Sequence, residues 1–400
     1  MTEQAAPTRE NTHPFREITL SFLKVGATAY GGPAILGMMQ AEFQETRRWV
    51  SKQRFLEGLS LVNVLPGAPM VQLGIFLGYV RAGWRGGLLA GACFSAPGFF
   101  VMLALALAYA TLGVNPVIRG ALYGLGPVVL AAFILAVYRL GRSALRSSTH
   151  RLIAAGAALA ALASPLGTVA ILLLAAAVGL FAFHSRARGA MALAFVAAAI
   201  VGASLMPPTA VALPGSDGTS RLVTLVALFS TIGAFTFGGG LSMIALLEEH
   251  VVSRLHWLSP EEFIAGLALS QLMPGPILMV AAYIGFKLHG VGGALAAAVA
   301  VFLPSFVLML GILPLFDRVR SLAWAQAVMQ GIAPAVVGVM TVVILRMSRS
   351  AAPDTPALLI LIATVAAMHL WRVTPMKAMV GGAVAGVVRS RILAVAGLAH

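Results

Sequence analysis

The chain has 400 residues, of which 60% are hydrophobic and only 10% are charged, and its formal net charge is +14. A soluble protein of this length carries far more charged surface, so the composition argues against the ordinary soluble classes. The basic residues lie in short loops between apolar segments, as in the cytoplasmic loops of membrane proteins, which argues against a nucleic-acid partner.

Apolar runs that match or approach the length of a membrane span recur along the chain. The first 14 residues are polar and show no cleavable signal, so we expect a polar tail at 1–14 and retention of the first apolar segment. The pattern predicts an all-α, polytopic integral membrane protein in a lipid bilayer, with about 10–13 hydrophobic segments. The clearest runs are 87–112, 116–138, 190–206, 291–315 and 323–345.

Motifs for chemistry are missing from the sequence. Cys93 is the single cysteine, which leaves no intrachain disulfide, and the eight histidines show no metal-ligand spacing. No nucleotide-binding loop or hydrolase elbow occurs in a suitable context. We therefore expect neither an enzyme nor a protein with a cofactor or a metal.

The two halves of the chain share one pattern. "FLKVGATAYGG" at 22–32 matches "FSTIGAFTFGG" at 229–239, 207 residues later, and "NVLPG" at 63–67 matches "QLMPG" at 271–275. The prolines at 97, 127, 304 and 334 keep this spacing. Internal repeats are typical of transporters, in which the second repeat is often inverted. We predict homologous repeats at 15–207 and 222–400, joined by a linker at 208–221.

Loop charges predict that the second repeat is inverted. The loops at 139–151 and 184–188 are basic, which places them in the cytoplasm, whereas the turn at 164–167 is neutral. Residues 39–57 are net basic, and the equivalent residues 247–262 are net acidic. The equivalent loops therefore lie on opposite sides of the membrane.

The same charges predict helical hairpins that enter the membrane and return. Residues 39–57 and the basic turn 81–85 share a side only if the segment 58–80 turns back at 66–69. By the same reasoning, 16–45 turns at Gly31–Pro33. Broken helices of this kind are tolerated at membrane depth only when they are buried in protein or line a wet cavity.

The breaks predict a binding site for an anion. A helix that restarts after a break has unpaired N–H groups and a partial positive charge, and glycine allows close approach of a ligand. All 13 carboxylates lie in termini, in loops or next to the breaks, which also favours an anionic over a cationic substrate. The proposed half-helix starts are Gly31, Gly32, Pro33, Pro66, Gly67, Gly238, Gly239, Gly240, Pro274, Gly275 and Pro276.

Three further pairs of polar residues have two interpretations each. Asn63 and Gln271 either donate to an oxyanion or satisfy carbonyls that the breaks release. Lys24 and Lys287 either contact substrate or extend to the membrane interface. Glu42 and Glu249, which align between the repeats at a spacing of 207 residues, either carry a coupling proton or are interfacial carboxylates that face basic loops.

These motifs resemble those of the chromate ion transporters in their long, two-domain form. The resemblance rests on "YGGP" and "FGGG", and on "NVLPGAPMVQLGIFLGY" (63–79) and "QLMPGPILMVAAYIGF" (271–286), and it covers nearly the whole chain. It differs at Ala68, where the family has a second proline, and at Gly240, which stands where the first half has Pro33. Among the motif positions the resemblance adds Gln72 to the candidate anion-binding residues.

The resemblance implies a secondary transporter that exports chromate across the cell inner membrane and confers chromate resistance, with sulfate as a competing substrate. A carrier of sulfate or another inorganic anion, or an anion channel of the same fold, is the alternative. The sequence leaves open whether membrane potential, proton exchange or sulfate exchange drives transport, and whether the chain forms a homodimer.

Overall fold

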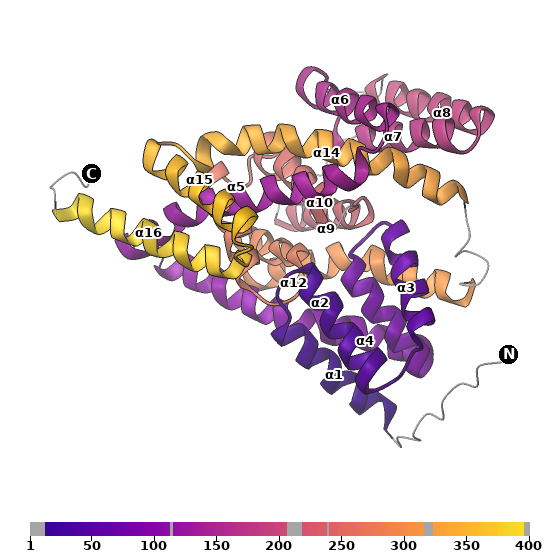
Figure 1. Cartoon of the computed structure of the whole chain (residues 1–400), viewed down its shortest axis with the longest axis horizontal. Helices are drawn as coiled ribbons and strands as arrows, with labels where there is room; N and C mark the ends of the chain where they lie inside the picture. Colours follow the sequence, from indigo (N-terminus) through magenta and orange to yellow (C-terminus); the bar gives the residue numbers. More distant parts are fainter. Residues whose placement is uncertain (1–12, 113–114, 206–217, 238–239, 316–322, 396–400) are drawn as a thin grey trace.

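The computed structural model describes residues 13–112, 115–205, 218–237, 240–315 and 323–395, which form helices and no β-strand (Figure 1). Most of the predicted linker, nearly all of the polar tail, Gly238 and Gly239 lie outside these described residues. The first half contains α1 (Pro14–Thr28), α2 (Gly32–Met39), the π-helical segment η1 (Gln40–Thr46), α3 (Lys52–Val64), α4 (Pro69–Leu112), α5 (Pro116–Ala144), α6 (Ser148–Ala163), α7 (Thr168–Phe183) and α8 (Arg186–Leu205). The second half contains α9 (Gly218–Ala234), α10 (Leu241–Leu247), the π-helical η4 (Glu248–Arg254), α11 (Pro260–Leu272), the 3-10 turn η5 (Ile277–Met279), α12 (Val280–Ile312), the 3-10 turn η6 (Leu313–Leu315), α14 (Ala323–Ala351), α15 (Thr355–Leu370) and α16 (Pro375–Val395).

The irregular features of the backbone occur twice, once in each half. The π segments η1 and η4 have equal length and lie 208 residues apart. The helices α4 and α12 both contain a sharp turn, at Gly83 with φ +63° and at Gly290 with φ +60°. Prolines 97 and 304 lie at equivalent positions inside these two helices. The two halves therefore share one structural plan in these features.

The breaks form the tips of antiparallel helical hairpins. The rings of Phe22 in α1 and Phe43 in η1 stack with their centroids 4.5 Å apart, so the chain reverses between them. In the next hairpin, a Cβ on Gly58 of α3 would overlap the ring of Phe76 in α4. This is the arrangement that the predicted re-entrant segments require, and their depth in a bilayer stays a prediction.

Four helical segments among the described residues are long and apolar enough to cross a membrane: Pro69–Leu112, Pro116–Ala144, Ile277–Ile312 and Ala323–Ala351. They contain three of the five apolar runs named above in full and most of the run 291–315. The run 190–206 falls mostly in α8, which is not among them. The breaks contribute to this number, because they divide the segments 14–46 and 218–254 into helices shorter than a membrane span. Large apolar side chains such as Phe100, Phe195 and Val307 are exposed on the surface, as in a protein that faces lipid.

The two halves are interlaced rather than separate. The first-half pair α6 and α7 packs on α14 of the second half, and α15 and α16 pack on α5 of the first (Figure 1). Glycines allow this close approach, because a Cβ on Gly124 of α5 would lie 1.9 Å from the carbonyl oxygen of Gly382 in α16. Close glycine contacts of this kind are typical of helix packing within membranes.

The equivalent helices α5 and α14 run antiparallel to each other. A Cβ on Gly126 would lie 3.3 Å from the carbonyl oxygen of Ala351, whereas a Cβ on Gly141 would lie 3.7 Å from Val337. Residue numbers therefore rise along α5 as they fall along α14.

Candidate functional site

The four breaks meet as two pairs, and each pair combines one break from each half. In the first pair, the backbone N–H of Gly67 donates to the carbonyl of Thr236, with 2.8 Å between nitrogen and oxygen. In the second pair, the N–H of Gly275 donates to the carbonyl of Ala29 at 3.0 Å. The two bonds are reciprocal, because Ala29 and Thr236 occupy equivalent positions, as do Gly67 and Gly275. The breaks are thus brought to the interface between the halves.

Glycine is required in both pairs because the backbone is left-handed there. The φ angle is +124° at Gly67 and +96° at Gly275. Their N–H groups were predicted to face an anion, but in this structure each donates a hydrogen bond to a backbone carbonyl of the other half. The first turn of α4 offers further N–H groups, because those of Met70 and Val71 lie at the start of the helix and have no acceptor within it.

Buried polar side chains surround the break at 65–68. The Oγ of Ser305 in α12 accepts the N–H of Ala68 at 2.8 Å, and the Nε2 of Gln72 donates to the carbonyl of Pro66 at 2.7 Å. The side-chain oxygen of Gln72 is buried and has no hydrogen-bond partner among the described residues. In the facing break, the Oγ of Ser242 accepts the N–H of Phe237 at 2.6 Å. We call this the polar junction: residues 65–68 and 235–237 with the buried side chains of Gln72, Thr236, Ser242 and Ser305.

The second pair of breaks carries small or apolar residues at the same positions. We call it the apolar junction: residues 29–31 and 273–276 with Ala34, Gly98 and Val280. Gly98 replaces Ser305, and Pro276, which has no N–H, replaces Ala68. The donor and the acceptor of one hydrogen bond are therefore both missing here. The two junctions therefore share a backbone arrangement but differ in the side chains at these equivalent positions.

The remaining predicted anion-binding residues lie in or beside the breaks. Gly31 and Gly240 are the N-caps of α2 and α10, with φ values of +78° and +99°. Gly32 and Pro33 begin α2, while Pro274 is buried in the apolar junction. The predicted amides at Asn63 and Gln271 are less enclosed, because Asn63 is exposed and Gln271 is half-buried.

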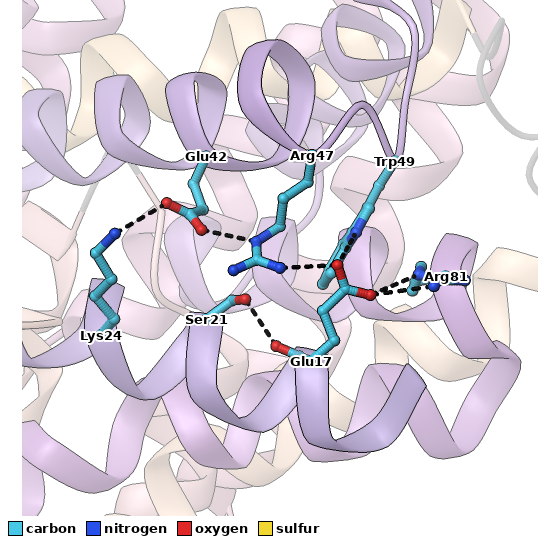
Figure 2. A network of polar contacts seen from close by, with 7 residues as sticks. All are labelled: Glu17, Ser21, Lys24, Glu42, Arg47, Trp49 and Arg81. Carbon is cyan, nitrogen blue, oxygen red and sulfur yellow. Dashed lines mark hydrogen bonds and ion pairs between the residues drawn. The ribbon is translucent and has the colours of Figure 1, made fainter. Parts of the chain in front are cut away.

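Lys24 and Glu42 belong to an ion-pair network on the first hairpin, which Figure 2 shows. The Nζ of Lys24 lies 3.3 Å from Glu42, and the Nε of Arg47 donates to the same carboxylate at 2.7 Å. Arg47 also contacts Glu17 at 2.8 Å, and Arg81 pairs with the other oxygen of Glu17 at 3.1 Å. The loops that carry Arg47 and Arg81 therefore lie together, as the hairpin prediction requires.

The network favours the ionised form of Glu42. Burial acts to raise the pKa of Glu42, but hydrogen bonds from Arg47 and Lys24 outweigh it, and the pKa lies below its usual value. The proton-carrying role was conditional on a pKa raised by burial, and the lowered pKa of Glu42 disfavours that role. The π segments also set a spacing of 208 residues, which makes His250, and not Glu249, the equivalent of Glu42. A single extra residue ahead of η4 causes the shift.

The other predicted charges bind carboxylates or helix ends. The Nζ of Lys287 lies 2.7 Å from Glu262, whose pKa is lowered because hydrogen bonds from Lys287 and the backbone of Ser259 outweigh its burial. Glu249 accepts the backbone N–H of Thr168, the first residue of α7, at 2.6 Å. Neither lysine is held at a junction; both ammonium groups pair with carboxylates of the hairpins.

Sequence reasoning missed Thr236, Ser242 and Ser305. Single serines and threonines in apolar segments are common, so none of them attracts notice alone. The signal that finds them is a position-by-position comparison of the two halves. It shows Thr, Ser and Ser where the first half has Ala29, Ala34 and Gly98.

Comparison with known proteins agrees with the motifs. A family model described as "Chromate transporter" matches residues 16–213 and again 223–387. The chain is 29% identical to the chromate transport protein of Cupriavidus metallidurans, over 93% of this chain and 92% of the relative. It is 31% identical to the chromate transport protein of Pseudomonas aeruginosa (90% and 88% covered) and 30% identical to the probable chromate transport protein of Synechococcus elongatus (94% and 97% covered). No solved structure matches the chain. With both halves matched by one family model, the chain belongs to the chromate transporter family.

Proposed function

We propose that the chain exports chromate across the cell inner membrane by alternating access between two inverted halves, and that the oxyanion binds at the polar junction. Family membership and the names of the relatives support the substrate. The observation that carries the site is the difference between the junctions. Buried hydroxyl and amide groups are costly in a membrane protein unless they are satisfied or used. Gln72, Thr236 and Ser305 lie at the polar junction, whereas the equivalent positions of the apolar junction hold Val280, Ala29 and Gly98.

Two observations support the inversion. If α5 and α14 both cross the membrane, their antiparallel packing means that the equivalent helices cross in opposite directions. In addition, Glu249 contacts the turn before α7, so the acidic segment 247–262 and the neutral turn 164–167 lie together. Loop charges assigned both to the outer side independently of this contact. The reciprocal junctions then lie where a rocking motion of one half against the other would open them in turn.

Labelling tests the inversion directly. Gln53 and Glu261 are equivalent, exposed residues at the starts of α3 and α11. In a chain whose single cysteine, Cys93, is replaced by serine, Gln53→Cys should react only from the cytoplasmic side and Glu261→Cys only from the outer side. A membrane-impermeant maleimide on whole cells and on everted vesicles measures this. Labelling of both from one side would contradict the inversion.

Transport tests the function and the site together. Everted vesicles expose the cytoplasmic face, so export appears as uptake of chromate, with sulfate as competitor. Gln72→Met keeps the volume of the side chain but removes the amide that holds the carbonyl of Pro66, and we expect at least a tenfold loss of uptake. Val280→Ala changes the equivalent residue of the apolar junction and should retain most uptake at equal expression. Uptake of sulfate without uptake of chromate would mean that the transported anion is sulfate. Flux that does not saturate with substrate concentration would favour a channel.

A further inference from the structure

A cavity of about 290 Å³ lies away from both junctions, between the turn 164–167, η4 and α14. It is large enough for a small oxyanion with several waters, since a water molecule takes about 30 Å³ in the liquid. Both halves contribute to its wall. Its charged side chains are Glu248, Glu249, Arg254 and Arg346.

Glu249 occupies a set of donors that suits an oxyanion. One carboxylate oxygen accepts the N–H of Thr168 at 2.6 Å, and the other lies 2.8 Å from Arg254. A helix start combined with a guanidinium group is a common anion-binding arrangement. A Cβ on Gly167, the N-cap of α7, would lie 2.9 Å from the same carboxylate. The bare Cα at Gly167 therefore allows the close approach.

A second arginine, Arg346, also lines the cavity. Arg346 lies 3.4 Å from Glu248 and donates to the carbonyl of Ala161 at the end of α6, at 2.9 Å. Ser253 also donates to Glu248, at 2.9 Å. Glu248 is therefore satisfied by two partners inside the wall. Glu249 instead bridges the two halves, because it lies in η4 and holds the start of α7.

We propose that this cavity is a second oxyanion site, and that Glu249 and the transported anion compete for the N–H of Thr168 and for Arg254. An arriving anion takes these donors and displaces the carboxylate, which breaks the link between α7 and η4. Loading of the site and loosening of the contact between η4 and the start of α7 are then one event. On the topology of the proposed function, the cavity faces the outer side and is the last site before release.

Titration of the purified full-length chain in detergent tests this, with molybdate as a tetrahedral dianion that lacks the oxidising power of chromate. Glu249→Gln removes the competing charge but keeps a side chain of the same size. We expect this variant to bind one molybdate more per chain than the wild type, or to bind it about tenfold more tightly. Adding Arg254→Gln should abolish the gain. Glu42→Gln is the matched control, because it neutralises a carboxylate that is paired with arginine in η1, and it should bind as the wild type does.

Equal stoichiometry and affinity in the wild type and Glu249→Gln would overturn the proposal and leave Glu249 as a helix cap. If Glu249→Gln does not yield folded protein, Arg254→Gln alone carries the test, and it must bind molybdate several-fold more weakly than the wild type. The result is separable from the proposed function. Molybdate binding at this cavity without chromate transport would contradict the function alone, whereas normal transport without the gain in binding would contradict only this site.

Discussion

The polar and apolar junctions share a backbone but not a chemistry. Each is closed by the N–H of a left-handed glycine from one half and a carbonyl from the other. Yet Ser305 and Ala68 form a hydrogen bond at the polar junction, while Gly98 and Pro276 can form none at the apolar junction. The repeat provides two junctions of the same backbone geometry. Their side chains differ as expected if the polar junction binds the anion and the apolar junction only packs the two halves together.

The largest difference between the junctions should follow from adding a methyl group to each glycine. A Cβ on Gly67 would lie 2.4 Å from the Oγ of Ser305 and 2.5 Å from the Nε2 of Gln72, whereas a Cβ on Gly275 meets no atom closer than 3.8 Å. We expect Gly67→Ala to abolish chromate uptake into everted vesicles. Gly275→Ala carries only the backbone strain, about 1–3 kcal/mol, and should keep part of the activity. Equal loss in both variants would mean that the junctions are functionally alike.

A smaller effect is expected when the serine of the polar junction is removed. Ser305→Ala leaves the buried N–H of Ala68 without its acceptor, which costs about 1–3 kcal/mol. We expect roughly a tenfold drop in uptake rate and a lower melting temperature. Ser95 on α4 has a buried hydroxyl without a partner among the described residues, so Ser95→Ala is the control and should change neither quantity. If Ser305→Ala takes up chromate at the wild-type rate, the polar junction has only a packing role and does not bind the anion.

The smallest effect on transport is expected from the network of the first hairpin. The pKa of Glu42 is lowered, so its ion pairs stabilise the fold above the usual glutamate pKa of about 4.3, and this contribution is lost as the pH falls through the lower folded value. Glu42→Gln should therefore melt at a lower temperature than the wild type at neutral pH, and the difference should disappear in acid. The pH profile of uptake around neutral pH should have the same shape in Glu42→Gln as in the wild type. A changed pH profile of uptake would restore Glu42 as a proton carrier.

Much of the architecture could be predicted from the sequence because its signals are periodic or repeated. Long apolar runs predict membrane helices, and glycines and prolines that recur at one spacing locate the breaks and the hairpin tips. The pairing of Gly67 with Thr236 could not be predicted, because which break meets which depends on how the halves pack. The predicted equivalence of Glu42 and Glu249 is wrong for a local reason. One inserted residue ahead of η4 changes the spacing between the halves from 207 to 208 residues, so Glu42 corresponds to His250.

The site itself was predictable only in its backbone. Glycine and proline reveal where a chain departs from helix, so the breaks at residues 31–33 and 66–67 stand out. Serine and threonine reveal little, because in a membrane helix they often bond to the preceding turn, as Thr236 does to Ile232. Their meaning comes from their partners across the interface, such as Ser305 with Ala68, which only the folded chain brings together.

The packing of helices from one half on helices of the other has a consequence for how the protein is assembled. The α6–α7 pair is synthesised well before its packing partner α14. The face of α7 around Gly179 therefore has no partner from α14 until the second half is made. A gene divided at the linker should then encode two fragments that are degraded when expressed alone and that assemble when they are expressed together. Each half acts, in effect, as the assembly chaperone of the other.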